Sequence, residues 1–304
     1  MPLSPAEQEL AGFLKPAFNQ EAFRVDRRRP FTFICGGNDQ DGISALRQQF
    51  LAHLRASTSP ILPVLAEKAF PHQLVERNLQ EFESYLASAA DCVLIFVESP
   101  GSFAETGLFA ALKKVRKKTF IINTRDESMK DSFLNLGPIK LIHRKSNFDR
   151  VHCLDKKEVT LQDAKDIVQF ILKNCTKYKH ALVFQPKDKF TELEVRLQLA
   201  CVHMAVTLLR AGTASLTTAI LREHFGNVDS LTVERCLSLL TGIDALGRQD
   251  ELYFNPNPQA FMDDALICST NFSVDEVRAK TLGWQAKNNG QVAVFLREQR
   301  GIDI

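Results

Sequence analysis

The sequence predicts an α/β protein, in which a Rossmann-like parallel sheet is followed by an α-rich winged helix-turn-helix domain. First, the run 92–97 is apolar and rich in β-branched residues, which is typical of a strand buried on both faces of a parallel sheet. Second, this run and an earlier one, 31–35, each end in a glycine-containing turn that precedes a helical pattern. Third, the periodicity after residue 191 is helical apart from one candidate hairpin.

The chain divides into four segments by composition and periodicity. An amphipathic helix over 4–23, strands near 31–35, 61–65, 92–97 and 119–123, and an edge strand at 151–154 are expected first. Helical patterns at 43–55, 74–90 and 161–172 alternate with these strands, as in β-α-β units. The predicted domains are an N-terminal helix (1–28), an α/β domain (29–176), a lysine-rich linker (177–190) and a winged-helix domain with a C-terminal extension (191–304).

The predicted winged-helix domain starts with helices at 192–210, 216–225 and 231–243 and continues into a hairpin at 246–254. A helix that reads base edges is expected to carry Arg, Asn or Gln. The third helix offers mainly Glu234 and Arg235, with Arg248 in the hairpin. A module that docks a partner or contacts a nucleic-acid backbone is therefore favoured over one that reads duplex sequence.

Composition bounds the class of protein. The 304 residues are 45% hydrophobic and 24% charged, with a net charge of +2, so no global excess of positive charge indicates a nucleic-acid binder. Local basic runs at 27–29 and 113–118 are either solvated faces or phosphate contacts. The seven cysteines form no C-x-x-C or zinc-like spacing and are expected to be small buried side chains in a reducing compartment. Without a signal peptide or an apolar run of about 20 residues, the chain is expected to be cytoplasmic, with no membrane partner and no metal.

The stretch from Asp91 to Gly107 is the strongest candidate for a functional site. Pro100 and Gly101 end the strand, and Ser102 is expected to cap the next helix with Glu105 three residues later, at capping-box spacing. Glu105 would then lie in the first helical turn at the carboxyl end of a central strand, where open α/β sheets bind ligands. The alternative is a carboxylate that only interacts with the helix dipole.

Two further features are expected at the same edge. Gly36 and Gly37 follow a strand and would let a ribose or phosphate approach the backbone, unless they form an ordinary tight turn. Glu83 lies on a predicted helix that runs antiparallel to the strand after it, so the earlier part of this helix is expected at the same edge of the sheet. The alternative is that Glu83 belongs only to a solvated helix face. Two carboxylates at one mouth suit glycosidic chemistry, in which one acts at the anomeric carbon and the other handles the proton.

The motif Gly-Ser-x-x-Glu-x-Gly at 101–107 resembles the signature of nucleoside 2-deoxyribosyltransferases and the glycine loop of nucleotide-cleaving phosphoribohydrolases. The resemblance implies that Glu105 is the nucleophile and that Glu83 is the second carboxylate. The ribose-binding Asp of the signature falls on Ser99, with Glu98 beside it, so recognition of the sugar hydroxyls is expected to differ.

Several segments together, namely 33–37, 98–103, 133–138 with Leu141, and the helical domain, resemble the effector of type II retrons. That family joins a deoxyribosyltransferase-like domain to a winged-helix domain. The resemblance implies an anti-phage toxin of abortive infection, an N-glycosidase that cleaves the ribose–base bond of NAD or a related nucleotide. It also implies control by a reverse transcriptase with its multicopy single-stranded DNA and RNA, in a higher-order assembly. The nucleotide is a substrate, and no cofactor is expected.

Glu105 and Glu83 are therefore predicted to be catalytic, and the predicted substrate-binding residues are Gly36, Gly37, Asp91, Glu98, Ser99, Gly101 and Ser102. Ser132, Asn135 and Gly137-Pro138 could contact substrate, although plain turn chemistry explains them better. One alternative function is a non-catalytic nucleotide-sensing regulator with a DNA-binding winged helix. The other is a nucleoside deoxyribosyltransferase, which Ser99 and the appended helical domain disfavour.

Overall fold

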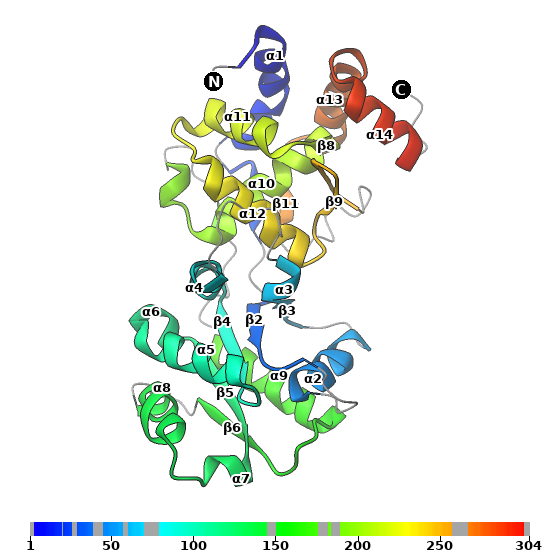
Figure 1. The fold of residues 1–304 in the computed structure, drawn as a ribbon. Coiled ribbons are helices and arrows are strands. Elements are labelled where there is room, and N and C mark those ends of the chain that lie inside the picture. The colour runs from blue at the N-terminus through cyan, green and yellow to red at the C-terminus, as the bar shows by residue number, and fades with distance from the viewer. Residues whose placement is uncertain are drawn as a thin grey trace. The chain divides into compact units, whose positions relative to one another are not determined.

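The computed structural model describes residues 3–19, 21–25, 29–38, 45–56, 60–69, 79–144, 150–175, 182–183, 189–256 and 267–300. The chain forms two compact units, each visible in Figure 1. The α/β unit comprises residues 28–70 and 75–179. The helical unit comprises residues 1–27, 71–74 and 180–304.

A five-stranded parallel sheet lies at the centre of the α/β unit, which confirms the predicted fold class. Its strand order is β3 (Leu62–Val64), β2 (Phe31–Cys35), β4 (Cys92–Phe96), β5 (Thr119–Thr124) and β6 (Val151–Leu154). Every residue of β2, β4 and β5 is buried, which explains their continuous apolar runs. The chain leaves β2 towards β3 and then returns to β4 on the other side. The carboxyl ends of β2 and β4 therefore flank the topological switch point, where such sheets bind ligands.

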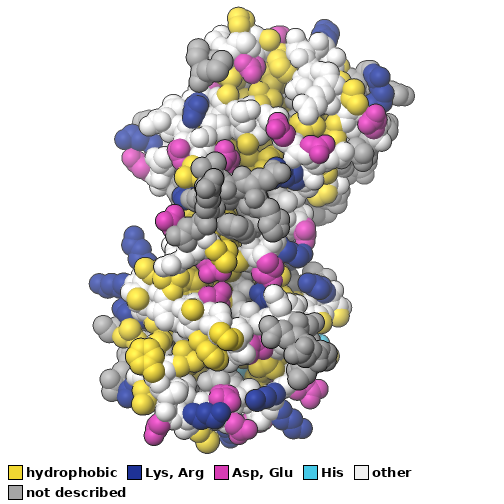
Figure 2. Space-filling model, in the orientation of Figure 1, with side chains coloured by type: hydrophobic (Ala, Val, Ile, Leu, Met, Phe, Trp, Pro, Cys, Tyr) yellow, Lys and Arg dark blue, Asp and Glu magenta, His cyan; other side chains and the backbone are white. Residues whose placement is uncertain are grey.

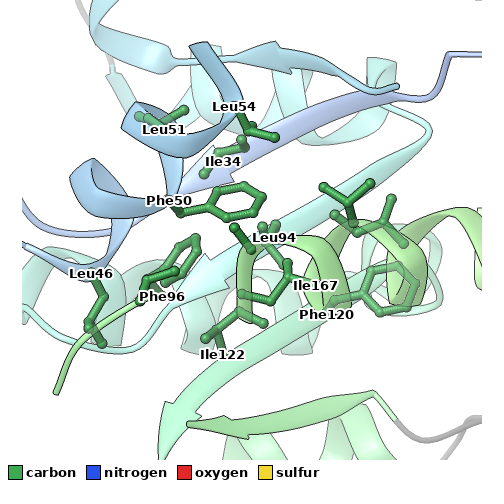
Figure 3. Packing of buried hydrophobic residues seen from close by; sticks show 14 of the residues in the cluster. Ile34, Leu46, Phe50, Leu51, Leu54, Leu94, Phe96, Phe120, Ile122 and Ile167 are labelled. Atoms are coloured by element: carbon green, nitrogen blue, oxygen red, sulfur yellow. The ribbon is translucent and has the colours of Figure 1, made fainter. Parts of the chain in front are cut away.

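Helices cover both faces of this sheet. On one face, α2 (Leu46–Arg55) and α9 (Leu161–Cys175) pack through Phe50 and Ile167 against Ile34, Leu94 and Phe96, as Figure 3 shows. On the other face lies α5 (Pro100–Ala111), because the ring of Phe109 packs 6.1 Å from that of Phe33, the strand neighbour of Ile34. The remaining elements of this unit are α3 (Ala66–Ala69), α4 (Leu79–Ala89), α6 (Lys113–Arg116), α7 (Arg125–Ser128), a π-helix η2 (Asn135–Ile139) and α8 (Lys140–Arg144).

The helical unit is built around the buried helix α10 (Val195–Leu209). After it come β8 (Ala211–Gly212), α11 (Ala214–Phe225), α12 (Ser230–Gly242) and a hairpin of β9 (Gly247–Gln249) and β10 (Leu252–Phe254), with strand order β8-β10-β9. The three helices and the hairpin that were expected after residue 191 are therefore present in this unit. Beyond the hairpin lie β11 (Ile267–Thr270), α13 (Val274–Asn288) and α14 (Gly290–Arg300).

The two ends of the helical unit meet in a second small sheet that the sequence did not predict. The N-terminal helix is α1 (Pro5–Leu14) with a 3-10 turn η1 (Lys15–Phe18), and it stops before residue 23, contrary to expectation. Strand β1 (Phe23–Val25) then pairs with β11 and with β7 (Leu182–Val183), which lies inside the predicted linker. These strands are short and their partners are far apart in the sequence, so local periodicity could not reveal them.

Two expectations of absence, and one on the cysteines, can be compared with the described part of the chain. No helix there is both long enough and apolar enough to cross a membrane. No group of three or more described His, Cys, Asp or Glu side chains could hold a metal ion. Cys35, Cys92, Cys201 and Cys236 are buried, but Cys153 is exposed, so the prediction of buried cysteines is wrong at that edge-strand position.

Candidate active site

The turn between β4 and α5 differs from the prediction in its cap. Helix α5 begins at Pro100 and is capped by Ser99, whose Oγ accepts a hydrogen bond from the Ser102 N–H at 3.2 Å. Proline suits this first helical position because its φ is already helical and its missing N–H would have no helical partner. The predicted cap at Ser102 is therefore wrong, and Glu105 lies beyond the first turn.

Ser102 instead closes the turn. Its buried Oγ accepts from the backbone N–H groups of Glu98 (3.1 Å) and Ser99 (3.0 Å) and donates to the Ser99 carbonyl (2.8 Å). These bonds use the hydroxyl's donor and both of its lone pairs. Ser102 thus shapes the loop through the backbone, whereas neighbouring Gly101 is exposed at the start of the helix.

Glu98 joins the β4 turn to the glycine turn after β2. Its carboxylate accepts from the backbone N–H groups of Gly37 (2.9 Å), Leu46 (2.6 Å) and Arg47 (3.1 Å). It therefore caps helix α2, whose own N-cap residue supplies no side-chain hydrogen bond. A Cβ at Gly36 would lie 2.8 Å from the Arg47 Cβ and 3.0 Å from the Glu98 Oε1. The space beside Gly36 is therefore filled by the side chains of Arg47 and Glu98, and not left open for a ribose or phosphate as expected.

The two predicted catalytic carboxylates are near neighbours in the structure. Glu105 on α5 lies beside Cys35 at the end of β2, Glu83 on α4 and Glu67 on α3. Burial, and next the negative charge of Glu83, raise the pKa of Glu105 from its ordinary 4.5 to about 7, although Arg47 opposes the shift. One oxygen of Glu105 is buried without a hydrogen-bond partner. Burial, and then Glu67, likewise raise the pKa of Glu83.

Arg47 supplies positive charge to this acid cluster, which we define as Glu67, Glu83 and Glu105. Its guanidinium is almost fully buried, donates from Nε to the Gly37 carbonyl at 3.0 Å and pairs with Glu67 at 2.8 Å. Its Nη2 also donates to the Asn38 side chain. The guanidinium therefore contacts both the glycine turn and the acid cluster.

We expect Arg47→Met to move the acid limb of any Glu105-dependent activity to higher pH, because the positive charge that lowers the Glu105 pKa is lost. The measurement is kcat/KM as a function of pH. The pH at which the limb falls does not depend on the fraction of the variant that is folded, because that fraction scales the whole profile. Arg47→Lys keeps the charge and is expected to shift the limb less. Arg55→Met, on the exposed end of the same helix, is the matched control; an unshifted limb in Arg47→Met would contradict the assignment.

Asp91 is not brought together with the other predicted residues. It precedes β4 and its Oδ2 accepts from the N–H of Phe31, the first residue of β2, at 2.7 Å. It thus holds the amino ends of two strands. A strand of five residues at about 3.3 Å per residue puts this edge roughly 16 Å from the carboxyl edge.

A cavity of about 500 Å³ lies at the carboxyl ends of β4 and β5. Of the predicted substrate-binding residues, Gly37, Glu98 and Ser99 line it. Neither catalytic candidate, Glu105 nor Glu83, is among the described residues that do so. The site therefore has two neighbouring compartments, the acid cluster and this cavity.

Sequence reasoning missed Asn123 and Thr124, which line the cavity from the end of β5 and are only 2% and 6% exposed. The sequence signal that could have identified them is a pair of polar residues at the end of an otherwise apolar strand. The segment after β5 also lines the cavity, through Ser132 and Asn135. Their hydrogen bonds are those of a turn: the Asn135 Nδ2 donates to the Glu127 carbonyl at 2.8 Å, and the Asn135 N–H donates to the Ser132 hydroxyl at 3.2 Å.

Comparison with known proteins decides the family. Residues 44–248 match the family described as "STM3845 retron effector protein", which is more than half of the chain. The chain belongs to this retron effector family.

Two proteins of Escherichia coli are similar to this retron effector. The "Retron Ec73 putative ribosyltransferase/DNA-binding protein" is 35% identical over 124 residues, 39% of each chain. The "Retron Ec86 putative ribosyltransferase/DNA-binding protein" is 32% identical over 151 residues, 48% of this chain and 47% of that one. The chain thus matches less than half the length of these relatives. Their names describe each of these two relatives as a putative ribosyltransferase and DNA-binding protein.

Proposed function

We propose that this retron effector is an N-glycosidase that cleaves the ribose–base bond of NAD or a related nucleotide at Glu105 and Glu83. The observation that carries the proposal is the pair of half-buried, interacting carboxylates beside the topological switch point. Perturbed carboxylate pairs are typical of sites that handle protons and developing positive charge. The relatives named as ribosyltransferases support the same class of chemistry.

In the proposed reaction, ionised Glu105 faces C1′ of the ribose. The bond from C1′ to the base nitrogen breaks and its electron pair stays with the base, while Glu105 stabilises or bonds to the oxocarbenium-like carbon. Nicotinamide leaves NAD as a neutral ring and needs no proton. A positively charged nicotinamide ring beside Glu105 would also favour the ionised carboxylate, offsetting the burial that raises its pKa in the free protein.

Glu83 completes the reaction as a general base. A water molecule attacks C1′, Glu83 takes its proton, and Glu105 is released as a carboxylate. A neutral purine would instead need a proton as it leaves, which the raised pKa of Glu83 allows it to supply.

In the cell, this activity would serve anti-phage defence as a toxin held in check by a reverse transcriptase and its multicopy single-stranded DNA, in the cytoplasm and in a higher-order assembly. Membership of the retron effector family supports that role. The helical unit is the part that would dock these partners, since its third helix offers few groups suited to reading bases.

The test is incubation of the purified full chain with NAD, followed by chromatography for free nicotinamide. We expect turnover whose kcat/KM rises between about pH 6 and 8 with an apparent pKa near 7, because Glu105 must lose its proton to act. Saturable NAD binding without nicotinamide release would contradict the proposal and favour a nucleotide sensor. Base exchange between deoxynucleosides without hydrolysis would favour a deoxyribosyltransferase.

A further inference from the structure

The cavity next to the acid cluster is a separate compartment of ligand size. Arg47 lies between the two, because it pairs with Glu67 of the acid cluster and donates to Asn38, which lines the cavity. With the scissile bond placed at Glu105 by the proposed function, this cavity would receive a part of the substrate that does not react.

Two polar groups of the cavity have no hydrogen-bond partner among the described residues. The Thr124 hydroxyl is buried and makes no hydrogen bond, although Thr124 is the N-cap residue of α7. The Asn123 Oδ1 accepts from the Thr124 N–H at 2.9 Å, and no described residue takes up the Asn123 Nδ2 donors. Buried polar groups are normally satisfied, so the unpartnered Thr124 hydroxyl indicates a polar ligand.

The described lining of the cavity carries charges of both signs, from Glu98, Glu127 and Lys157. The Glu98 carboxylate is engaged within the protein, because it accepts hydrogen bonds from three backbone N–H groups. Glu127 pairs with Lys130 at 2.8 Å, and this bond lowers its pKa. Lys157 also lines the cavity, and its charge helps to lower the Glu127 pKa; among the described lining residues it is the cation that could contact a phosphate.

One wall of the cavity is apolar. Phe103, which is 44% exposed, and Leu134 both line the cavity. Figure 2 shows hydrophobic side chains gathered on the surface of the α/β unit, and exposed Phe103, Phe133 and Leu136 belong to α5 and the segment after β5. An exposed aromatic ring at the mouth of a polar cavity is suited to stacking a heterocycle.

We propose that this cavity binds the nucleoside diphosphate half of a dinucleotide substrate. Lys157 contacts the phosphates, Asn123 and Thr124 bind the sugar or base edge, and Phe103 stacks on the ring. Because the acid cluster and the cavity would then hold opposite halves of one molecule, the enzyme selects dinucleotides over simple nucleosides.

The test uses ADP as the probe, with calorimetry on the full chain. We expect Thr124→Val and Lys157→Gln each to weaken ADP binding by about 5- to 20-fold, since each removes one polar or charged contact. Lys156→Gln, an exposed neighbour that does not line the cavity, is the matched control and should bind as the unmodified protein does. The same two substitutions should lower kcat/KM for NAD by a similar factor and leave kcat/KM for nicotinamide riboside unchanged.

Unchanged ADP affinity in both Thr124→Val and Lys157→Gln would overturn the cavity assignment, even if the protein cleaves NAD. An equal loss for NAD and nicotinamide riboside would overturn it too, since the effect would then lie at the reacting half. Weakened ADP binding in a protein that does not cleave NAD would support the diphosphate site while the N-glycosidase proposal fails.

Discussion

Glu105→Gln is expected to lower kcat/KM for NAD by at least about 10³-fold. The amide keeps the size of the side chain but can neither attack C1′ nor stabilise its positive charge, and such losses are typical when a nucleophile is removed. The measurement is nicotinamide release by the purified variant, with Glu81→Gln on the exposed face of α4 as the matched control. Turnover that persists in Glu105→Gln would refute the assignment of the nucleophile.

The same substitution is expected to stabilise the fold at alkaline pH. The Glu105 pKa is raised from 4.5 to about 7, so the folded state binds this proton more tightly than the unfolded state. The protonated Glu105 side chain therefore stabilises the fold fully below about pH 4.5, and this stabilisation is lost as the pH rises through about 7. Gln mimics the protonated form throughout, so the variant should be more stable by about 2–3 kcal/mol at pH 8 and nearly equal at pH 4.

Thermal or urea unfolding of both proteins at pH 4 and pH 8 checks this sign. An inactive variant that is also more stable at pH 8 cannot owe its inactivity to misfolding. A lower stability of Glu105→Gln at pH 8 would contradict the burial and charge repulsion assigned to this carboxylate.

Glu98→Ala is expected to destabilise the α/β unit by about 2–4 kcal/mol. The substitution removes the acceptor of three backbone N–H groups, at Gly37, Leu46 and Arg47, and leaves the start of α2 without a cap. The measurements are the urea midpoint and the hydrogen exchange of those three amides. Glu127→Ala, which removes a carboxylate paired at the surface with Lys130, is the control and should leave the stability nearly unchanged. Equal losses in the two variants would contradict the structural role of Glu98.

Much of the α/β unit could be predicted because its strands are defined by local composition. The runs that became β2, β4 and β5 are apolar because both faces of the sheet are covered, and this is visible residue by residue. Strand β1 could not be predicted, because its partner β11 lies more than 240 residues away. The cap of α5 was misplaced by three residues, because Ser99 and Ser102 both suit a cap and only their mutual hydrogen bonds distinguish them.

The candidate site shows the same division. Pattern alone placed Glu105 after a buried strand and Glu83 on the preceding helix, because a parallel strand and its flanking helices return to one edge. Which polar groups face a ligand depended instead on long-range packing. Glu98 is engaged by the backbone of a distant turn, Asp91 lies at the far edge of the sheet, and Asn123 and Thr124 enter the cavity. Hydrogen-bond partners and burial arise only when segments far apart in the chain come together, so they cannot be read from neighbouring residues.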